Sequence, residues 1–168
     1  MKTKNIQKWI GISLGAILLS CISFACSSSK KVVKLNSDDI KNMVDSSQFV
    51  FVADRVLPLR GRTRNLTSRY TVKLTKDTLD CDLPFFGRAT QAPMDPSKGG
   101  IQFVSNKFSY DVVTKKEDQW NVTIKPDDNT SVQQLFFTIF SNGSANLSVI
   151  STYRDAISFS GHIERRKE

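Results

Sequence analysis

The sequence predicts an all-β domain: an antiparallel meander of about eight or nine strands that forms a lipocalin-like barrel or a sandwich, with one short helix before it. Two observations lead to this fold class. Apolar and polar residues alternate over many short segments, which is the period of a strand with one wet face. Turn residues separate these segments at the spacing of hairpins. The sequence contains no internal repeat and no low-complexity segment.

The first segment of the chain has the layout of a secretory signal. Lysines at the amino terminus precede an uncharged apolar block. Its end resembles the lipobox of bacterial lipoproteins, in which a cysteine becomes the new amino terminus and carries the lipid, typically with a palmitate chain. Cys21 follows the better lipobox match, but Cys26 is followed by a polar start, Ser27-Ser28-Ser29. We expect lipid attachment at Cys26, with Cys21 as the alternative.

These features divide the chain into three parts. Residues 1–25 are the expected signal peptide, residues 26–36 a flexible tether, and residues 37–168 a single β domain. The rival interpretation of the leader is a transmembrane anchor, for which about 17 apolar or small residues are short. A lipid would hold the domain at a membrane surface without spanning it. We therefore expect a cell-envelope protein of a Gram-negative bacterium, at the outer membrane, with its domain in the periplasm or at the cell surface.

Charge and cysteine content exclude several classes of protein. The leader holds three of the 24 basic residues and none of the 16 acidic ones, so the mature chain carries 21 against 16, a net charge of +5. This mild excess, without a nucleic-acid-binding motif, argues against DNA or RNA as a partner. Cys81 is the remaining cysteine and has no intramolecular partner, so no disulfide framework is expected. We expect it to be a buried, structural thiol.

The first half of the domain begins with a helix and continues as strands. A capping residue, acids in the first turn and apolar residues at helical spacing predict a helix over residues 37–46. Residues 48–54 alternate as a strand with both faces covered, and residues 55–69, with proline, glycine and five arginines, are expected to be a loop. Residues 70–74 and 79–83 are expected to pair as a hairpin that points Cys81 into the core and Asp80 and Asp82 into water.

The second half repeats the strand pattern after an irregular connection over residues 91–100. Pro126-Asp127-Asp128-Asn129 is expected to be a turn, and Asn142-Gly143 predicts a type I′ hairpin turn. Alternating segments predict strands at 101–103, 108–112, 120–124, 134–140, 145–149 and 157–163.

Several motifs also resemble a known family of bacterial lipoproteins, the one called domain of unknown function 4251. The resemblance covers about residues 44 to 163 and implies an envelope-anchored β domain; it implies no reaction. The motifs that carry it are Leu-Pro-Phe-Phe-Gly-Arg-Ala at 83–89, Gly-Gly-Ile-Gln-Phe at 99–103, Tyr110, Trp120, Asn-Gly-Ser-Ala at 142–145 and Ile-Ser-Phe-Ser-Gly at 157–161.

Two stretches form the candidate binding surface. In the first, Phe85 and Phe86 follow a strand-ending proline, and Arg88 is expected to place a planar cation beside an exposed ring. The stretch either plugs a barrel end or forms the lip of a ligand or partner site. In the second, Arg60, Arg62 and Arg64 alternate, so in an extended loop they would lie on one side and bind an anion such as phosphate, sulfate or an acidic sugar. The alternative for these arginines is a solvated loop near anionic lipid headgroups.

The sequence gives little support to catalysis. His162 is the lone histidine and is expected to point outward, with no carboxylate within hydrogen-bond reach in a pocket. Asp80 and Asp82 share a face, but more simply keep a strand edge soluble. No metal-ligand spacing, nucleophile motif or phosphate-binding glycine loop is present, so we expect no enzyme, no metal site and no cofactor.

Three functions remain open. The first is a non-catalytic binding or scaffolding lipoprotein for an apolar or anionic ligand or an envelope partner. The second is a purely structural envelope protein with a filled barrel, and the third, least supported, is a hydrolase. A cavity inside the barrel would favour the first over the second.

Overall fold

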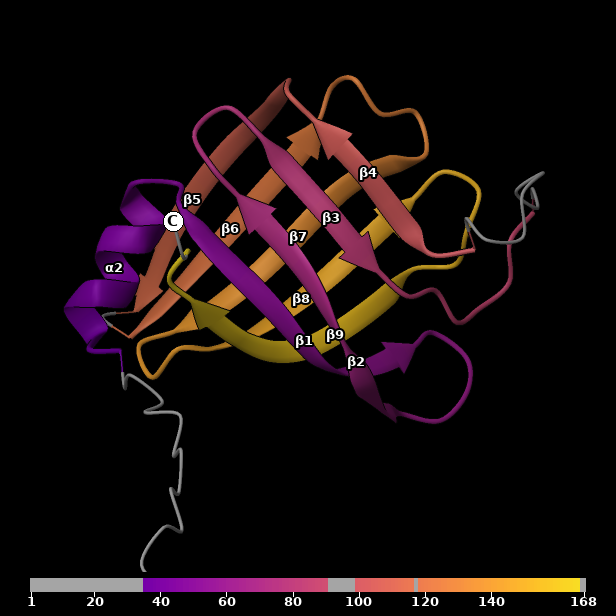
Figure 1. Ribbon diagram of the computed structural model, residues 1–168, viewed down its shortest axis with the longest axis horizontal. Helices are drawn as coiled ribbons and strands as arrows, with labels where there is room; N and C mark the ends of the chain where they lie inside the picture. The colour runs from indigo at the N-terminus through magenta and orange to yellow at the C-terminus, as the bar shows by residue number, and fades with distance from the viewer. Residues whose placement is uncertain (1–34, 91–98, 117, 167–168) are drawn as a thin grey trace, which may run out of the picture. The chain divides into compact units, whose positions relative to one another are not determined.

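The computed structural model describes residues 35–90, 99–116 and 118–166 of the chain. The described fold contains one helix and nine strands (Figure 1). Their bounds are α2 Ser37–Asp45, β1 Phe49–Pro58, β2 Arg64–Leu74, β3 Leu79–Leu83, β4 Ile101–Ser105, β5 Phe108–Lys116, β6 Gln119–Pro126, β7 Val132–Phe140, β8 Ser144–Ser151 and β9 Ile157–Glu164.

All nine strands belong to one antiparallel sheet. The strand order is β4-β3-β2-β1-β9-β8-β7-β6-β5, so the first and last strands of the chain pair with each other in the middle. The sheet curls into a nearly closed barrel whose two edge strands are β4 and β5 (Figure 1). The barrel prediction is confirmed, and the sandwich alternative is not what the chain adopts.

Aromatic and aliphatic side chains fill the inside of the barrel. Phe49, Phe51, Phe137 and Phe159 are each at most 1% exposed. The Phe137 ring meets Phe49 and Phe51 edge to face, with centroids 5.7 and 5.6 Å away. These rings belong to one contiguous cluster of buried residues contributed by the helix and by strands from both halves of the chain. The interior therefore stabilises the fold as a packed core: each fully buried ring contributes about 2 kcal/mol.

The helix packs on the barrel through an apolar stripe, as the sequence predicts. Ile40, Met43 and Val44 are buried, and the carboxylate of Asp39 accepts a hydrogen bond from the backbone N–H of Asn36 at the helix start. The Tyr110 hydroxyl on β5 donates to the carbonyl of Val44 at 2.7 Å. This contact ties the last turn of α2 to an edge strand of the sheet.

The β2–β3 hairpin forms in the expected register. Val72 lies opposite Cys81 and Leu74 opposite Leu79. Cys81 is 1% exposed, and burial, aided by the charges of Asp80 and Asp82, raises the pKa of its thiol far above its usual value. The expectation of a buried, structural cysteine is confirmed.

The loop expected over residues 55–69 is wrong. β1 continues to Pro58 and β2 begins at Arg64, so the turn is only residues 59–63. An antiparallel sheet with a wet outer face accepts arginines along its strands, so a high arginine content did not indicate a loop here. The predicted connection at 91–100 lies mostly outside the described residues.

The turn between β7 and β8 also differs from its expectation. Gly143 has a φ of +83°, but Asn142 keeps a negative φ, so the turn is not type I′. Instead, the Gly143 N–H donates to the Phe140 carbonyl at 2.9 Å, and three residues link the strands. This is a tight turn followed by one left-handed glycine, and the Asn142 side chain accepts from the Ser144 N–H at 2.9 Å.

Candidate functional site

A β-bulge in β1 builds a polar site on the outer face of the barrel. Ala53 lies opposite Gly161 and Arg55 opposite Ser160, which leaves Asp54 as the extra residue. A bulge turns two successive side chains toward the same face, and both Asp54 and Arg55 are exposed. The sequence pattern did not select Asp54, and it associated Arg55 only with the arginine-rich stretch that contains Arg60, Arg62 and Arg64.

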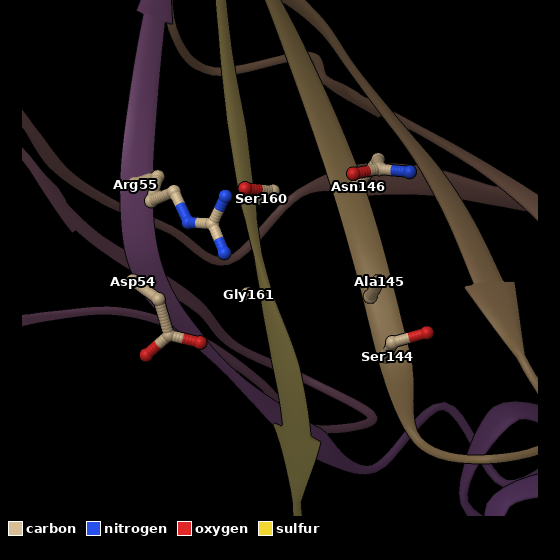
Figure 2. Close-up of a pocket in the computed structure, with 7 residues that line it drawn as sticks. All are labelled: Asp54, Arg55, Ser144, Ala145, Asn146, Ser160 and Gly161. Carbon is tan, nitrogen blue, oxygen red and sulfur yellow. The ribbon is translucent and has the colours of Figure 1, made fainter. Parts of the chain in front are cut away.

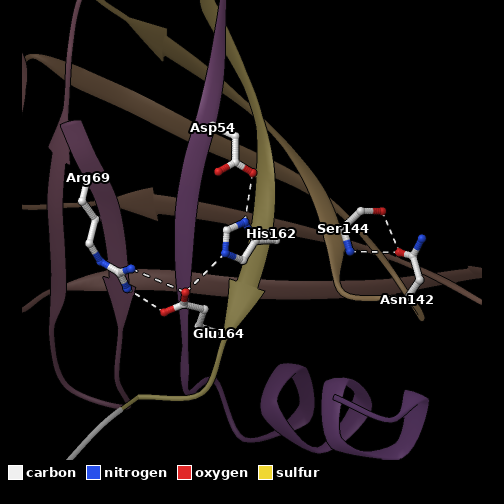
Figure 3. A network of polar contacts seen from close by, with 6 residues as sticks. All are labelled: Asp54, Arg69, Asn142, Ser144, His162 and Glu164. Carbon is white, nitrogen blue, oxygen red and sulfur yellow. Dashed lines mark hydrogen bonds and ion pairs between the residues drawn. The ribbon is translucent and has the colours of Figure 1, made fainter. Parts of the chain in front are cut away.

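His162 connects this bulge to a polar network over three strands (Figure 3). Its Nδ1 lies 2.9 Å from Oδ2 of Asp54 on β1, and its Nε2 lies 3.3 Å from Oε1 of Glu164 on β9. Glu164 in turn accepts a hydrogen bond from Nη2 of Arg69 on β2 at 2.6 Å. The network thus alternates acid, imidazole, acid and guanidinium.

The network covers the outer face of β1. Because β2 and β9 flank β1, the pair of Arg69 and Glu164 must reach across it. Beneath this crossing lie Val50 and Val52, which are 7% and 6% exposed although they point away from the barrel interior. Val50 lies opposite Glu164 and Val52 opposite His162, and directly opposed residues share a face, so the low exposure of the two valines fits cover by the side chains of the network.

The network also changes the protonation of its members. Burial alone would lower the pKa of His162, but hydrogen bonds and charges from Asp54 and Glu164 outweigh burial and raise that pKa above its usual value. The Arg69 hydrogen bond, with help from His162, holds the pKa of Glu164 below its usual value. The arrangement therefore favours a protonated imidazole between two carboxylates.

His162 was expected to have no carboxylate within hydrogen-bond reach in a pocket; Asp54 and Glu164 do lie within reach of it, but on the outer face of the barrel and not inside a pocket. Asp54 comes from 108 residues earlier in the chain, and no local sequence signal indicates that pairing. The two nitrogens both face carboxylates, so neither is left free to accept a proton from a nucleophile. Ser144, the register partner of His162 on β8, turns its hydroxyl to Asn142 at 2.6 Å instead (Figure 3).

A shallow hollow of about 230 Å³ lies next to the network (Figure 2). His162 itself does not line it, so the histidine and the carboxylate do not meet inside a pocket. Its volume is below the usual range of small-molecule pockets, about 300 Å³ upwards. The residues that line it are Asp54, Arg55, Ser144, Ala145, Asn146, Ser160 and Gly161.

The predicted arginine and phenylalanine residues meet at the other end of β1. The guanidinium of Arg64, at the start of β2, lies over the ring of Phe86, 5.0 Å from its centroid. Arg60 and Arg62 are exposed in the adjoining turn. The structure therefore brings together two stretches that are separate in the sequence, although Arg64 belongs to a strand and not to an extended loop.

Arg154, which the sequence analysis did not select, holds the second ring. Its guanidinium lies 5.0 Å from the centroid of Phe85 and donates to the carbonyls of Gly99 and Gly100 at 3.1 and 2.7 Å. Arg88 was expected to lie beside an exposed ring. The Arg88 side chain is exposed, but the guanidiniums that lie over the two rings are those of Arg64 and Arg154. That Arg154, and not Arg88, lies over the Phe85 ring follows only from the packing of the 152–156 turn against residues 84–90.

We call this surface the arginine-aromatic rim. Both rings are half-buried against the core, so the rim also covers one end of the barrel. In the described part of the chain, none of its arginines forms an ion pair with an acidic side chain. Its members are Arg60, Arg62, Arg64, Phe85, Phe86, Arg88 and Arg154.

Two further findings concern the residues that the structure describes. No helix among them is long and apolar enough to cross a membrane. Within the same ranges, no cluster of three or more His, Cys, Asp or Glu side chains is placed to hold a metal ion. The expected lipid sites, Cys21 and Cys26, lie outside the described residues.

The fold and these surfaces define a barrel-shaped β domain with a packed interior and polar sites on its outside. The family model described as Domain of unknown function (DUF4251) matches residues 32–163, and the chain belongs to this family. A similar solved structure is the crystal structure of a DUF4251 family protein from Bacteroides eggerthii DSM 20697. It is 18% identical, with a TM-score of 0.56, over 77% of this chain and 87% of that one. No curated protein matches the chain.

Proposed function

We propose that the protein is a lipoprotein of the bacterial cell envelope whose barrel is a non-catalytic binding or scaffolding domain. The observation that carries the proposal is the arginine-aromatic rim. Arg60, Arg62, Arg64 and Arg88 are exposed there and lack an acidic partner among the described residues. Guanidinium groups match phosphate, sulfate and carboxylate geometry, so the rim suits an anionic ligand or the anionic surface of an envelope partner.

The packed core supports binding on the outside of the barrel. Fully buried rings and aliphatic side chains occupy the interior, which leaves the rim as the better place for a ligand. The same observation favours the second candidate, a purely structural envelope protein with a filled barrel. The occupied nitrogens of His162 support a structural network and give a hydrolase no support from this residue.

Lipid attachment is tested by replacing each leader cysteine. We expect Cys26→Ser to abolish incorporation of labelled palmitate and to release the protein from the membrane fraction, while Cys21→Ser leaves both unchanged. The reverse pattern would identify Cys21 as the attachment site. Labelling that survives the double replacement would contradict the lipoprotein proposal.

Binding at the rim is tested with a charge-matched pair of triple variants of the full-length chain. The rim variant carries Arg60→Gln, Arg62→Gln and Arg88→Gln, and the control carries Lys76→Gln, Lys107→Gln and Lys125→Gln at exposed positions elsewhere. On an immobilised sulfated polysaccharide, we expect the rim variant to elute at clearly lower salt than the control. Equal elution of the two variants would favour the purely structural role.

A further inference from the structure

β5 is an edge strand of the sheet, and β4, the strand that precedes it in the sequence, does not pair with it. Only Asn106 and Lys107 separate β4 from β5, yet the two strands lie at opposite ends of the strand order (Figure 1). The link between them is held by the turn between β6 and β7, chiefly through Asp128. Its carboxylate accepts from the Ser105 hydroxyl and from the Asn106 N–H, and the Lys107 carbonyl accepts from the Asp127 N–H. The turn between β6 and β7 thus forms hydrogen bonds with the polar groups of the residues that link β4 to β5.

The edge of β5 is long and partly apolar. The strand has nine residues and contains neither proline nor glycine. Val113 is 59% exposed on its outer face, and Val112 is 36% exposed on the other face. An unpaired strand edge with exposed apolar side chains is a template for another strand. Among the described residues, β6 is the only strand that pairs with β5.

The charges along β5 indicate what kind of strand would fit. In an antiparallel pair of two β5 strands centred on Val113, each Val113 faces its copy, and Asp111 of each chain faces Lys115 of the other. Directly opposed side chains point to the same face, so both acid–lysine pairs would flank the valine contact. Neither Asp111 nor Lys115 forms an ion pair with another described residue. In the pairing with β6, Thr114 lies opposite Trp120 and Lys116 opposite Gln119, so Lys115 is the extra residue of a bulge. Its long flexible stem still lets the ammonium group reach Asp111 of the other chain.

We propose that β5 is a self-association edge, at which two copies of this chain pair their β5 strands antiparallel about Val113. The contact is isologous, so it closes at two copies and does not propagate. A single strand pair buries little surface, so the dimer is weak and its population rises with protein concentration. This proposal is independent of the rim, which lies at another part of the barrel.

Charge reversal tests the register. Asp111→Lys makes both cross-strand pairs Lys–Lys, Lys115→Asp makes both Asp–Asp, and the double variant restores two opposite-charge pairs. By sedimentation of the full-length chain in mild detergent, we expect each single variant to weaken dimerisation about tenfold and the double variant to recover it. Asp127→Lys, at an exposed acid in the β6–β7 turn, controls for net charge and should dimerise as the unmodified chain does. Single variants that dimerise normally, or a double variant that fails to recover although its circular dichroism is native, would overturn the proposal.

A crosslink provides a second readout that does not depend on charge. Val113→Cys places two thiols opposite each other across the proposed axis, within reach of a disulfide. Val104→Cys is the matched control, because Val104 is 62% exposed on the other edge strand. We expect oxidation of the Val113→Cys variant to give more disulfide-linked dimer than oxidation of the unmodified chain. The Val104→Cys variant should give little dimer beyond that background. Equal crosslinking of the two variants, or capture of a different protein by the 113 variant without a homodimer, would contradict self-pairing.

Discussion

The stabilising contribution of the polar network on the outer face depends on the protonation of His162. Its pKa is raised in the folded chain, so its stabilising contribution is complete below the unfolded value of about 6.5 and is lost as the pH rises through the folded pKa. The pKa of Glu164 is lowered, so its contribution is present above about 4.5 and is lost as the pH falls through the folded pKa. The network is therefore most stabilising between about pH 4.5 and pH 6.5.

Replacement of the histidine should reveal this window. We expect His162→Gln to lower the free energy of unfolding more at pH 6 than at pH 9, because the contribution of the imidazolium is complete below about pH 6.5 and is lost as the pH rises through the raised pKa of the folded chain. Urea unfolding at both pH values measures the difference. The chain contains no other histidine, so no second imidazole titrates in this range. A difference between the two proteins that does not change with pH would mean that His162 acts through packing alone.

At the scale of elements, the contact of β1 with β9 depends on the glycine at 161. A Cβ atom at this position would lie 1.9 Å from the carbonyl oxygen of Val52, which is backbone and cannot move aside like a flexible side chain. This contact lies beside the bulge at Asp54, and both Asp54 and Gly161 line the hollow next to the network. The glycine is thus required by the pairing of the first strand with the last.

The cost of a side chain at this contact should be large. We expect Gly161→Ala to lower the free energy of unfolding by about 3 kcal/mol, through strain between the two strands. Ser160→Ala, one residue earlier on the same strand, is the control and should cost less than about 1 kcal/mol. Denaturant unfolding of both variants makes the comparison. An alanine at 161 that costs no more than the Ser160 control would show that the strands separate easily at the bulge.

At the scale of the whole molecule, local patterns predicted most of the strands along the chain but neither the break in the sheet between β4 and β5 nor the sites. Alternation places Cys81 in the core and defines its hairpin, because a two-residue period and a turn are properties of adjacent residues. The contacts of His162 with Asp54 and of Arg64 with Phe86 join distant strands and depend on the barrel register. The bulge that sets this register at Asp54 has no local sequence signal. Polarity identified Arg60, Arg62, Arg64 and Arg88 as candidates, but only tertiary packing shows that the guanidiniums over the rings are those of Arg64 and Arg154.

Because Cys81 is buried in the single core of the barrel, its reaction with a thiol reagent reports on global unfolding. The thiol is 1% exposed within one contiguous buried cluster, and its raised pKa leaves almost no reactive thiolate. A thiol reagent should therefore modify Cys81 only when β2, β3 and the helix separate together.

We expect labelling of the Cys81 peptide, followed by mass spectrometry, to be slower than in the unfolded chain by about the folding equilibrium constant, some 10³-fold or more. Its dependence on urea should match that of global unfolding, since a single core has no part that opens alone at this position. Labelling that is fast and insensitive to urea would instead show that the β3 and β4 edge detaches from the barrel, and would make that edge the mobile part of the fold.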